Sequence, residues 1–204
     1  KLKFEGEYLN GKKWNGKGYN KEVNIAFEIK DGKGYIKEYD DDSNLLFEAE
    51  YLNGQRNGKG KEYNYFNGKL EFEGEYLNGE RNGKGKEFNY YGDLTFEGEY
   101  INGIKWNGKV KEYNYYDGKL EFEGEYLNGR KNGKGKEYYE NNELMFEGEY
   151  FNGKKWNGKG YNNSGIIELE IKSGKGKGKQ YNYDGILEFE GEYLNGERNG
   201  KGKE

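Results

Sequence analysis

The sequence predicts an all-β protein, an elongated, single-layer, twisted antiparallel sheet built from successive β-hairpin repeats. The phrase Phe-Glu-Gly-Glu-Tyr-Leu-Asn-Gly begins at Phe4, Phe72, Phe122 and Phe189, and close variants begin at Phe47, Phe96 and Phe146. Aromatic and charged residues alternate in each copy, and an Asn-Gly pair closes it. Units this short hold no hydrophobic core of their own, so neighbouring units must bury apolar surface against one another.

The copies are spaced as in a solenoid. With two shortened copies at Phe27 and Leu169, the opening positions are 4, 27, 47, 72, 96, 122, 146, 169 and 189, and the intervals between them run from 20 to 26 residues. A longer period of 142 residues is superimposed, because residues 1–62 align with residues 143–204 without a gap. We therefore expect residues 1–204 to form a single array of about nine hairpin units, itself part of a longer array.

Each unit is expected to begin with a strand, as the copy at Phe72 illustrates. Along residues 72–76 the two aromatic rings and the glycine point to one side, and the two glutamates point to the other. This period of two is typical of a half-buried strand. The Asn-Gly pair within residues 77–82 predicts a hairpin turn, because both residue types accept positive φ.

A return strand and a second turn complete the unit. Residues 84–88 again end in an aromatic ring, and Gly92-Asp93 marks the turn that precedes the next copy. Each unit is therefore predicted to be strand, turn, strand, turn.

Charged residues should face one another across the hairpin. We expect Glu73 and Glu75 to lie opposite lysines of the return strand, such as Lys84 and Lys86. Exposed pairs of this kind contribute about 0.2–1 kcal/mol each, so they aid register and solubility more than stability.

Glycine recurs between the two aromatic residues of the first strand. Because glycine weakens a strand interior, we expect it to provide space for a ring of the neighbouring strand to lie across the bare backbone. Ala49 replaces this glycine in one unit, so a small residue is sufficient. The residues predicted to build the repeat are Phe72, Gly74, Tyr76, Gly79, Gly83, Gly85, Phe122, Gly124 and Tyr126.

Composition limits the classes of function. The chain is 31% hydrophobic and 35% charged, which alone favours disorder, but its 18% aromatic content at fixed offsets argues for a folded array. The 34 basic and 38 acidic residues are mixed along the chain, which leaves no basic stripe for nucleic acid. Without cysteine, the redox compartment is not indicated. The compartment stays open: the cytoplasm is favoured, and secretion or the cell surface is not excluded.

The glycine spacing carries a family resemblance. The run from Phe72 to Gly85, with glycines at 74, 79, 83 and 85, resembles the MORN (membrane occupation and recognition nexus) repeat. The run from Glu137 to Tyr150 is similar to the variant MORN repeats of bacteria, protists and large viruses. The resemblance covers nearly the whole chain. It implies successive antiparallel hairpins and a role in scaffolding, self-association or protein contact, with lipid binding proposed for some members.

Three tryptophans lie in hairpins that are one residue longer than the others. Trp14, Trp106 and Trp156 each precede an Asn-Gly pair. Their rings either project from one edge as contacts for a partner, as interface residues of this type often do, or fold back over their own hairpin.

Catalytic and metal sites are not expected. The chain has neither His nor Cys, so the commonest general base, the thiol nucleophile and the usual zinc ligands are missing. Residues 11–17 and 153–159 fit most of a phosphate-loop spacing, but glycine follows where Ser or Thr must hold magnesium. Residues 40–44 approach a calcium loop, but Leu45 takes the place of the required glycine. We expect a non-enzyme without metal or cofactor.

Three functions remain open. The first is a structural or interaction repeat protein that binds a protein partner or itself, possibly end to end, through an extended β surface. The second is a ligand-binding hairpin array, like the cell-wall-binding repeats in which rings of adjacent hairpins cage a choline-type cation or stack on glycans. The third is a membrane-surface scaffold, which the mixed charge disfavours. We expect neither nucleic acid nor a small-molecule substrate as partner.

Overall fold

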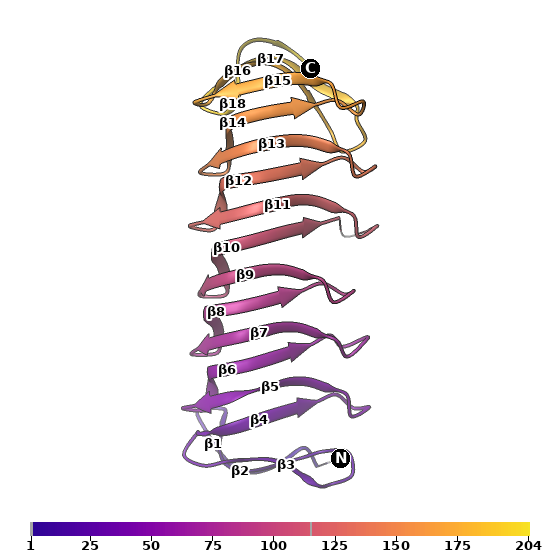
Figure 1. Ribbon diagram of the computed structural model, residues 1–204. Coiled ribbons are helices and arrows are strands. Elements are labelled where there is room, and N and C mark those ends of the chain that lie inside the picture. Colours follow the sequence, from indigo (N-terminus) through magenta and orange to yellow (C-terminus); the bar gives the residue numbers. More distant parts are fainter. Residues whose placement is uncertain (1, 115) are drawn as a thin grey trace. The chain divides into compact units, whose positions relative to one another are not determined.

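The computed structural model describes residues 2–114 and 116–204 and confirms the all-β class and the antiparallel hairpin repeats (Figure 1). These residues form eighteen strands and no helix, and accordingly no helix long and apolar enough to cross a membrane is found among them. The chain divides into two compact units, Lys1–Lys105 and Trp106–Glu204.

The first unit consists of hairpins that pair in chain order. Strands β1 to β3 form one antiparallel sheet, and β4 to β9 pair as antiparallel neighbours in a second ladder. The strands are β1 (Phe4–Leu9), β2 (Lys12–Tyr19), β3 (Ile25–Ile29), β4 (Gly34–Tyr39), β5 (Leu45–Leu52), β6 (Gln55–Tyr63), β7 (Leu70–Leu77), β8 (Glu80–Phe88) and β9 (Leu94–Ile101).

The second unit repeats the same pattern. Its strands also pair antiparallel with their neighbours in the chain, from β10 to β18. They are β10 (Ile104–Tyr113), which begins at the unit boundary, β11 (Leu120–Leu127), β12 (Arg130–Tyr138), β13 (Leu144–Phe151), β14 (Lys154–Tyr161), β15 (Ile167–Lys172), β16 (Lys175–Tyr181), β17 (Leu187–Leu194) and β18 (Glu197–Lys203).

The Asn-Gly turns are shorter than predicted, as the connection at residues 77–82 shows. Only Asn78 and Gly79, with φ of 53° and 92°, lie between β7 and β8, so the flanking residues of the 77–82 segment belong to strands. Positive φ at both positions is the geometry of the two-residue hairpin turn. A β-bulge makes this possible, because the register shifts between Gly74 and Tyr76 and the surplus residues of β8 are taken up there.

Hydrogen bonds between successive turns hold the hairpins together along this edge. The backbone N–H of Gly79 donates to the carbonyl oxygen of Arg56 at 2.9 Å, and that of Gly103 donates to Arg81 at 2.8 Å. The second unit shows the same bond from Gly153 to Lys131 at 2.8 Å. Each turn is thereby anchored to the preceding hairpin.

At the opposite edge, asparagine side chains shape the connections between hairpins. The Asn64 side-chain oxygen accepts hydrogen bonds from the backbone N–H groups of Phe66 and Asn67, at 2.9 and 3.1 Å. Asn89 accepts in the same way from Tyr91 and Asp93, at 3.0 and 2.9 Å. Such side chains replace backbone partners in a turn, so the strands can end without unsatisfied donors.

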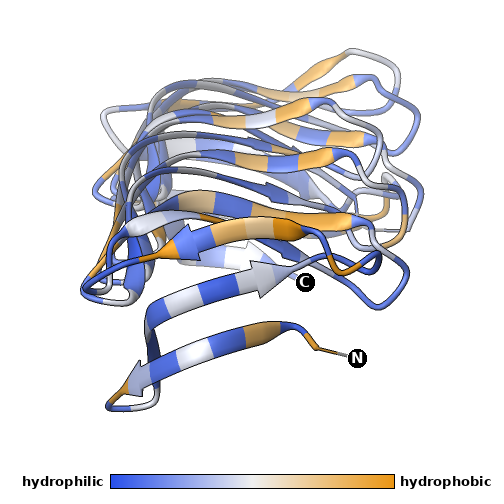
Figure 2. Ribbon diagram, turned by 90° about the horizontal axis from the view of Figure 1, so that it is seen from below, coloured by the Kyte–Doolittle hydropathy of each residue, from blue (hydrophilic) through white to orange (hydrophobic). Residues whose placement is uncertain are grey.

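The core consists of aromatic rings packed on glycine. Figure 2 shows hydrophobic and hydrophilic positions alternating along the strands, and the buried positions include Phe72, Tyr76 and Tyr100. The Phe72 ring packs edge to face against both tyrosine rings, with centroid distances of 5.5 and 5.2 Å. A Cβ atom added at Gly85 would lie 2.7 Å from the Phe72 ring. The Phe72 ring therefore lies across the bare backbone of the neighbouring strand at Gly85, whereas the prediction placed such a ring over Gly74.

One pair of strands differs between the two halves of the 142-residue repeat. Strands β15 and β16 pair along their length, whereas β3 and β4 share only the isolated bridge from Lys30 to Lys33. A Cβ atom at Gly178, on β16, would lie 2.1 Å from the carbonyl oxygen of Glu168. Ile36 occupies the equivalent position of β4 and is fully buried. Its side chain has no room in a close ladder, which explains why the pairing is interrupted there.

Tyrosine hydroxyls add links within hairpins, from Tyr63 and Tyr181, and between hairpins, from Tyr139. Tyr63 donates to Glu48 at 2.8 Å, Tyr181 donates to Glu168, and Tyr139 donates to the carbonyl oxygen of Tyr161 at 2.5 Å. Burial, together with the adjacent negative charge, raises the pKa of each of these three tyrosines from 10.0 to about 12.

Replacing Gly74 by valine is expected to destabilise the sheet. A Cβ atom there would lie 2.6 Å from the Phe72 ring and 2.7 Å from backbone atoms of β8, so the strands must separate. Overpacking of this kind costs about 1–3 kcal/mol. The measurement is the midpoint of urea unfolding. Glu73→Val, which adds the same side chain on the opposite face, serves as the control, and equal midpoints for the two variants would contradict the packing argument.

Alkali is expected to unfold the protein. Because the folded-state pKa of Tyr63, Tyr139 and Tyr181 lies above 10.0, the unfolded chain releases these protons first, so stability is intact below pH 10 and falls as the pH rises toward about 12. Urea midpoints measured across this range, with tyrosinate absorbance recorded in parallel, test this. A midpoint that stays constant over the range would show that the hydroxyl contacts are not maintained.

Candidate functional site

Two rows of mostly charged side chains cover the face of the first unit opposite the aromatic rings. We call them the first and second charge rows. The first charge row contains Lys37, Glu48, Lys61, Glu73, Lys86 and Glu97, one from each strand from β4 to β9. The second charge row contains Tyr35, Glu50, Lys59, Glu75, Lys84 and Glu99 from the same strands. Apart from Tyr35, lysine and glutamate alternate along both rows.

The hairpin register produces this alternation. In the Cα pairing, Lys61 lies opposite Glu48 on one side and opposite Glu73 on the other. Within the two rows, the lysines come from the return strands and the glutamates from the first strands of the hairpins, so charged neighbours carry opposite charges. Cross-strand partners of opposite charge favour this register over a slipped one.

The predicted pairs across the hairpin are only partly correct. Glu73 and Lys86 are Cα partners, but the Lys86 ammonium lies 3.3 Å from Glu97 of the next hairpin. Lys84 meets Glu75 through its backbone N–H, at 2.8 Å, where the bulge brings that group to the carboxylate. The ion pair from Lys37 to Glu48, at 3.5 Å, likewise joins successive hairpins. The charges therefore connect hairpins as well as the strands within them.

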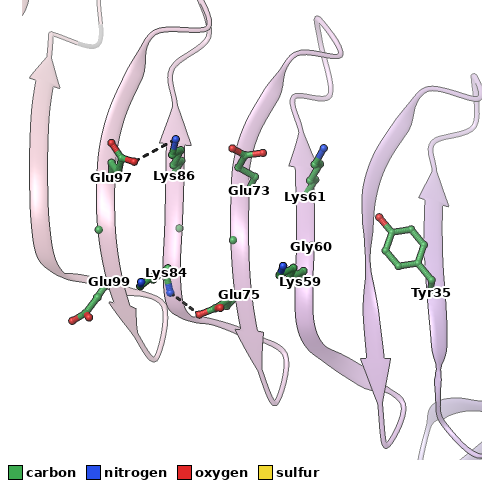
Figure 3. A pocket seen from close by; sticks show the side chains of 13 residues that line it. Tyr35, Lys59, Gly60, Lys61, Glu73, Glu75, Lys84, Lys86, Glu97 and Glu99 are labelled. Carbon is green, nitrogen blue, oxygen red and sulfur yellow. Dashed lines mark hydrogen bonds and ion pairs between the residues drawn. The ribbon is translucent and has the colours of Figure 1, made fainter.

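A groove of about 520 Å³ runs between the two charge rows. Its floor includes the backbone of Gly60, Gly74, Gly85 and Gly98, and its walls are the lysine and glutamate side chains of β6 to β9 (Figure 3). Tyr35, 47% exposed, lies at the end of the groove toward β4. The site thus combines a smooth backbone floor with walls of balanced, alternating charge.

The groove fits binding better than chemistry. The backbone N–H and C=O groups in the floor already pair within the ladder. A bound molecule would therefore contact the charged ends and the aliphatic parts of the lysine and glutamate side chains, and not free backbone groups. In the described residues, no group of three or more acidic side chains is arranged to hold a metal ion. Alternating charges select a partner by its complementary pattern more than by net charge.

Cations on the aromatic face stabilise the sheet beneath the groove. The Arg81 guanidinium carbon lies 4.2 Å from the centroid of the Phe72 ring, within cation–π range. Arg81, on β8, also donates to Glu62 of β6 and, at 2.9 Å, to Glu87 of its own strand. With its contact to Phe72 of β7, it joins three strands. Burial of Glu62 acts against its ionisation, but hydrogen bonds from Arg81 and Tyr76 hold the pKa of this carboxyl below its usual value.

This stack recurs in other copies, although the sequence analysis did not predict it. Arg56 lies over Phe47 at 3.6 Å, Lys131 over Phe122 at 3.7 Å and Lys155 over Phe146 at 4.6 Å. The sequence feature that marks this cation–π contact is a basic residue two positions after the Asn-Gly pair, and each of these copies has one. The pattern was missed because a residue that close to a turn reads as part of a solvated loop.

The residues predicted to build the repeat lie in β7, β8 and β11 and in the turn between β7 and β8. Phe72 and Phe122 are fully buried, Tyr76 is 3% exposed and Tyr126 is half-buried. Gly74 and Gly124 each lie beneath the ring of the preceding phenylalanine, and Gly85 lies beneath the Phe72 ring. Gly79 and Gly83 have φ of 92° and 95°; Gly79 lies in the turn between β7 and β8, and Gly83 lies in the bulged part of β8.

The tryptophans are half-buried at the edge that carries the Asn-Gly turns. Trp14 and Trp156 are the additional residues of β-bulges, and each ring lies against the turn glycine of the following hairpin, Gly32 or Gly174. Trp106 accepts a hydrogen bond from Gly129 at 2.8 Å through its carbonyl oxygen. Contact of these rings with a partner stays a prediction.

Comparison with known proteins gives one match. The sequence profile of the MORN repeat matches residues 47–64, 72–88, 122–143 and 189–204. These segments cover the first strands at Phe47, Phe72, Phe122 and Phe189 with their return strands. A search of curated proteins found no match.

Replacing Arg81 by leucine is expected to lower stability by about 1–3 kcal/mol, because Glu62 and Glu87 lose a charged donor and Phe72 loses its stacked cation. Urea midpoints measure the loss. Arg81→Lys is the control, and it should retain most of the stability, since lysine occupies this position over Phe122. A leucine variant as stable as the lysine variant would disprove the role of the cation.

Proposed function

Because this chain is a repeat protein that carries four MORN repeats, we propose that it is a non-catalytic scaffold that binds a protein partner through the groove of its first unit. The observation that supports this most directly is the alternation of lysine and glutamate along both walls of the groove. MORN repeats are often protein or membrane interaction modules, and the balanced charge of the groove supports a protein partner over a membrane.

The charge of the groove distinguishes among partners. Lys59, Lys61, Lys84 and Lys86 are balanced by Glu73, Glu75, Glu97 and Glu99 in its walls. Nucleic acid and anionic membranes are attracted by an excess of basic residues, which this surface lacks. A polypeptide, which can present acidic and basic side chains in turn, meets every wall residue with an opposite charge.

The shape of the groove indicates what part of a polypeptide enters it. Glycine backbone forms the floor, so an apolar ridge can approach closely between the rows, while flanking charged side chains reach the walls. We propose a segment with an apolar strip and charges on both sides. Main-chain pairing contributes little, since the groove crosses the middle of a ladder whose backbone groups are already bonded.

The alternative of glycan binding rests on a different observation. Exposed ring pairs lie on the connections between hairpins, where Tyr65 meets Phe66 at 5.3 Å and Tyr90 meets Tyr91 at 5.6 Å between centroids. Phe66 is 84% exposed. Aromatic rings at the surface suit stacking on sugars as well as contact with protein.

A peptide-display selection against the whole chain tests the proposal. Enriched peptides should combine an apolar strip with both signs of charge. A double variant, Lys86→Glu with Glu97→Lys, exchanges the two charges of one ion pair in the groove wall. It should bind the enriched peptides about tenfold more weakly. The exchange keeps the ion pair between positions 86 and 97 and inverts its charges toward the peptide, but it sets a glutamate opposite Glu73. Circular dichroism therefore checks that each variant is folded, and the control exchange below sets a glutamate opposite Glu123 in the same way.

The matched control exchanges Lys136 and Glu147, which form the corresponding 3.3 Å pair in the second unit. That variant should bind the selected peptides like the original protein. Peptides that ignore both exchanges would overturn the proposed groove. Glycan-array binding that is lost in Phe66→Ser and unaffected by the Lys86–Glu97 exchange would favour the alternative instead.

A further inference from the structure

A second cavity, of about 320 Å³, lies in the second unit. Three connections between hairpins surround it, those that join β10 to β11, β12 to β13 and β16 to β17. They contribute Tyr116, Tyr139 and Tyr183 to its lining. Tyr139 is buried, whereas Tyr183 is 38% exposed and Tyr116 is 92% exposed. Aromatic residues from three separate connections thus border one cavity.

A local departure from the repeat builds this cavity. Tyr139 occupies the position at which Asn64, Asn89 and Asn114 form their side-chain turns in other copies. Its ring is 1% exposed, and its hydroxyl is held by the carbonyl oxygen of Tyr161. A second contact, from the backbone N–H of Glu140 to the carbonyl oxygen of Tyr183 at 3.1 Å, joins two of the three connections.

The cavity is rich in negative charge. Asp117, Glu121, Glu140 and Asp184 line it, against Lys119 as the basic lining residue. Lys119 lies 3.3 Å from Asp117 and 3.4 Å from Glu140. Within residues 2–114 and 116–204, neither Glu121 nor Asp184 has an ion-pair partner.

The electrostatics of Tyr183 agree with this excess of negative charge. Burial raises the pKa of the Tyr183 hydroxyl, and the negative charge of Glu121, Glu137 and Glu112 raises it further. The hydroxyl therefore stays neutral, and the ring keeps the uncharged π face that attracts cations. An anionic ligand would meet the same repulsion that disfavours the tyrosinate.

We propose that this cavity binds an alkylammonium group, of the quaternary type carried by choline or by a trimethylated lysine side chain. Tyrosine rings attract such cations through their faces, and nearby carboxylates supply the compensating charge. A metal ion fits less well, because no group of three or more acidic side chains in the described part of the chain is arranged to coordinate one. The proposal is independent of the groove in the first unit.

Titration of the whole protein with choline, followed by NMR, tests the charge requirement. Choline should saturate one site, and its uncharged carbon isostere, dimethylbutanol, should bind at least about tenfold more weakly, since it has the same shape and lacks the cation. A peptide that contains trimethyllysine, compared with the same peptide containing unmodified lysine, shows whether the group is also recognised on a protein. Equal binding of choline and its isostere would overturn the proposal.

Variants at exposed positions locate the site. Tyr183→Leu and Asp184→Asn should each weaken choline binding several-fold, whereas Tyr183→Phe should retain it, because the ring rather than the hydroxyl faces the cation. Tyr139 is left intact because its buried ring supports the fold. Tyr91→Leu and Asp93→Asn, on a corresponding connection of the first unit, are the matched controls. Choline binding unchanged by the Tyr183→Leu and Asp184→Asn variants would place the cation elsewhere and refute the assignment.

Discussion

The packing of phenylalanine and tyrosine rings over bare glycine is the constraint on which the rest of the structure depends. It fixes which residues of neighbouring strands lie opposite one another, since Phe72 and Tyr100 fit only where Gly85 leaves room for them. Once this register is set on the aromatic face, the alternating lysines and glutamates on the other face follow from the pleat of the strands. The groove is thus a consequence of packing on the face opposite to it.

Much of this fold could be predicted from the sequence, because it is encoded locally. The alternation along residues 72–76 and the Asn-Gly pair each act over a few residues, so the strands and turns were identified correctly. The need for a small residue between the two aromatic residues was also predictable, since Ala49 fills that position in one unit. The ring over Gly74 is that of Phe72 on the same strand, however, and not one of the neighbouring strand as predicted. The turn length was predicted less well, because a bulge between Gly74 and Tyr76 changes how many residues the return strand needs.

The candidate sites depend on contacts between distant residues, and sequence reasoning located neither. The groove exists only when β6 to β9 lie side by side, and the cavity in the second unit requires three separate connections to meet around Tyr139. Single departures from a repeat are also difficult to recognise as important from the sequence. Tyr139 in place of an asparagine and Ile36 in place of Gly178 are single changes in a repeat, yet one builds a cavity and the other interrupts a ladder.

The chain of hydrogen bonds between successive Asn-Gly turns has a mechanical consequence within each unit. A force that pulls hairpins apart along the stacking direction is parallel to the bonds from Gly79 to Arg56 and from Gly103 to Arg81, and to the ladder bonds beside them. Hydrogen bonds that are pulled along their own direction break one pair of strands at a time, because the bonds of different strand pairs do not share the load. Since each hairpin contacts only its neighbours, rupture at one rung leaves the others folded, and each unit yields to tension stepwise, as an extensible element.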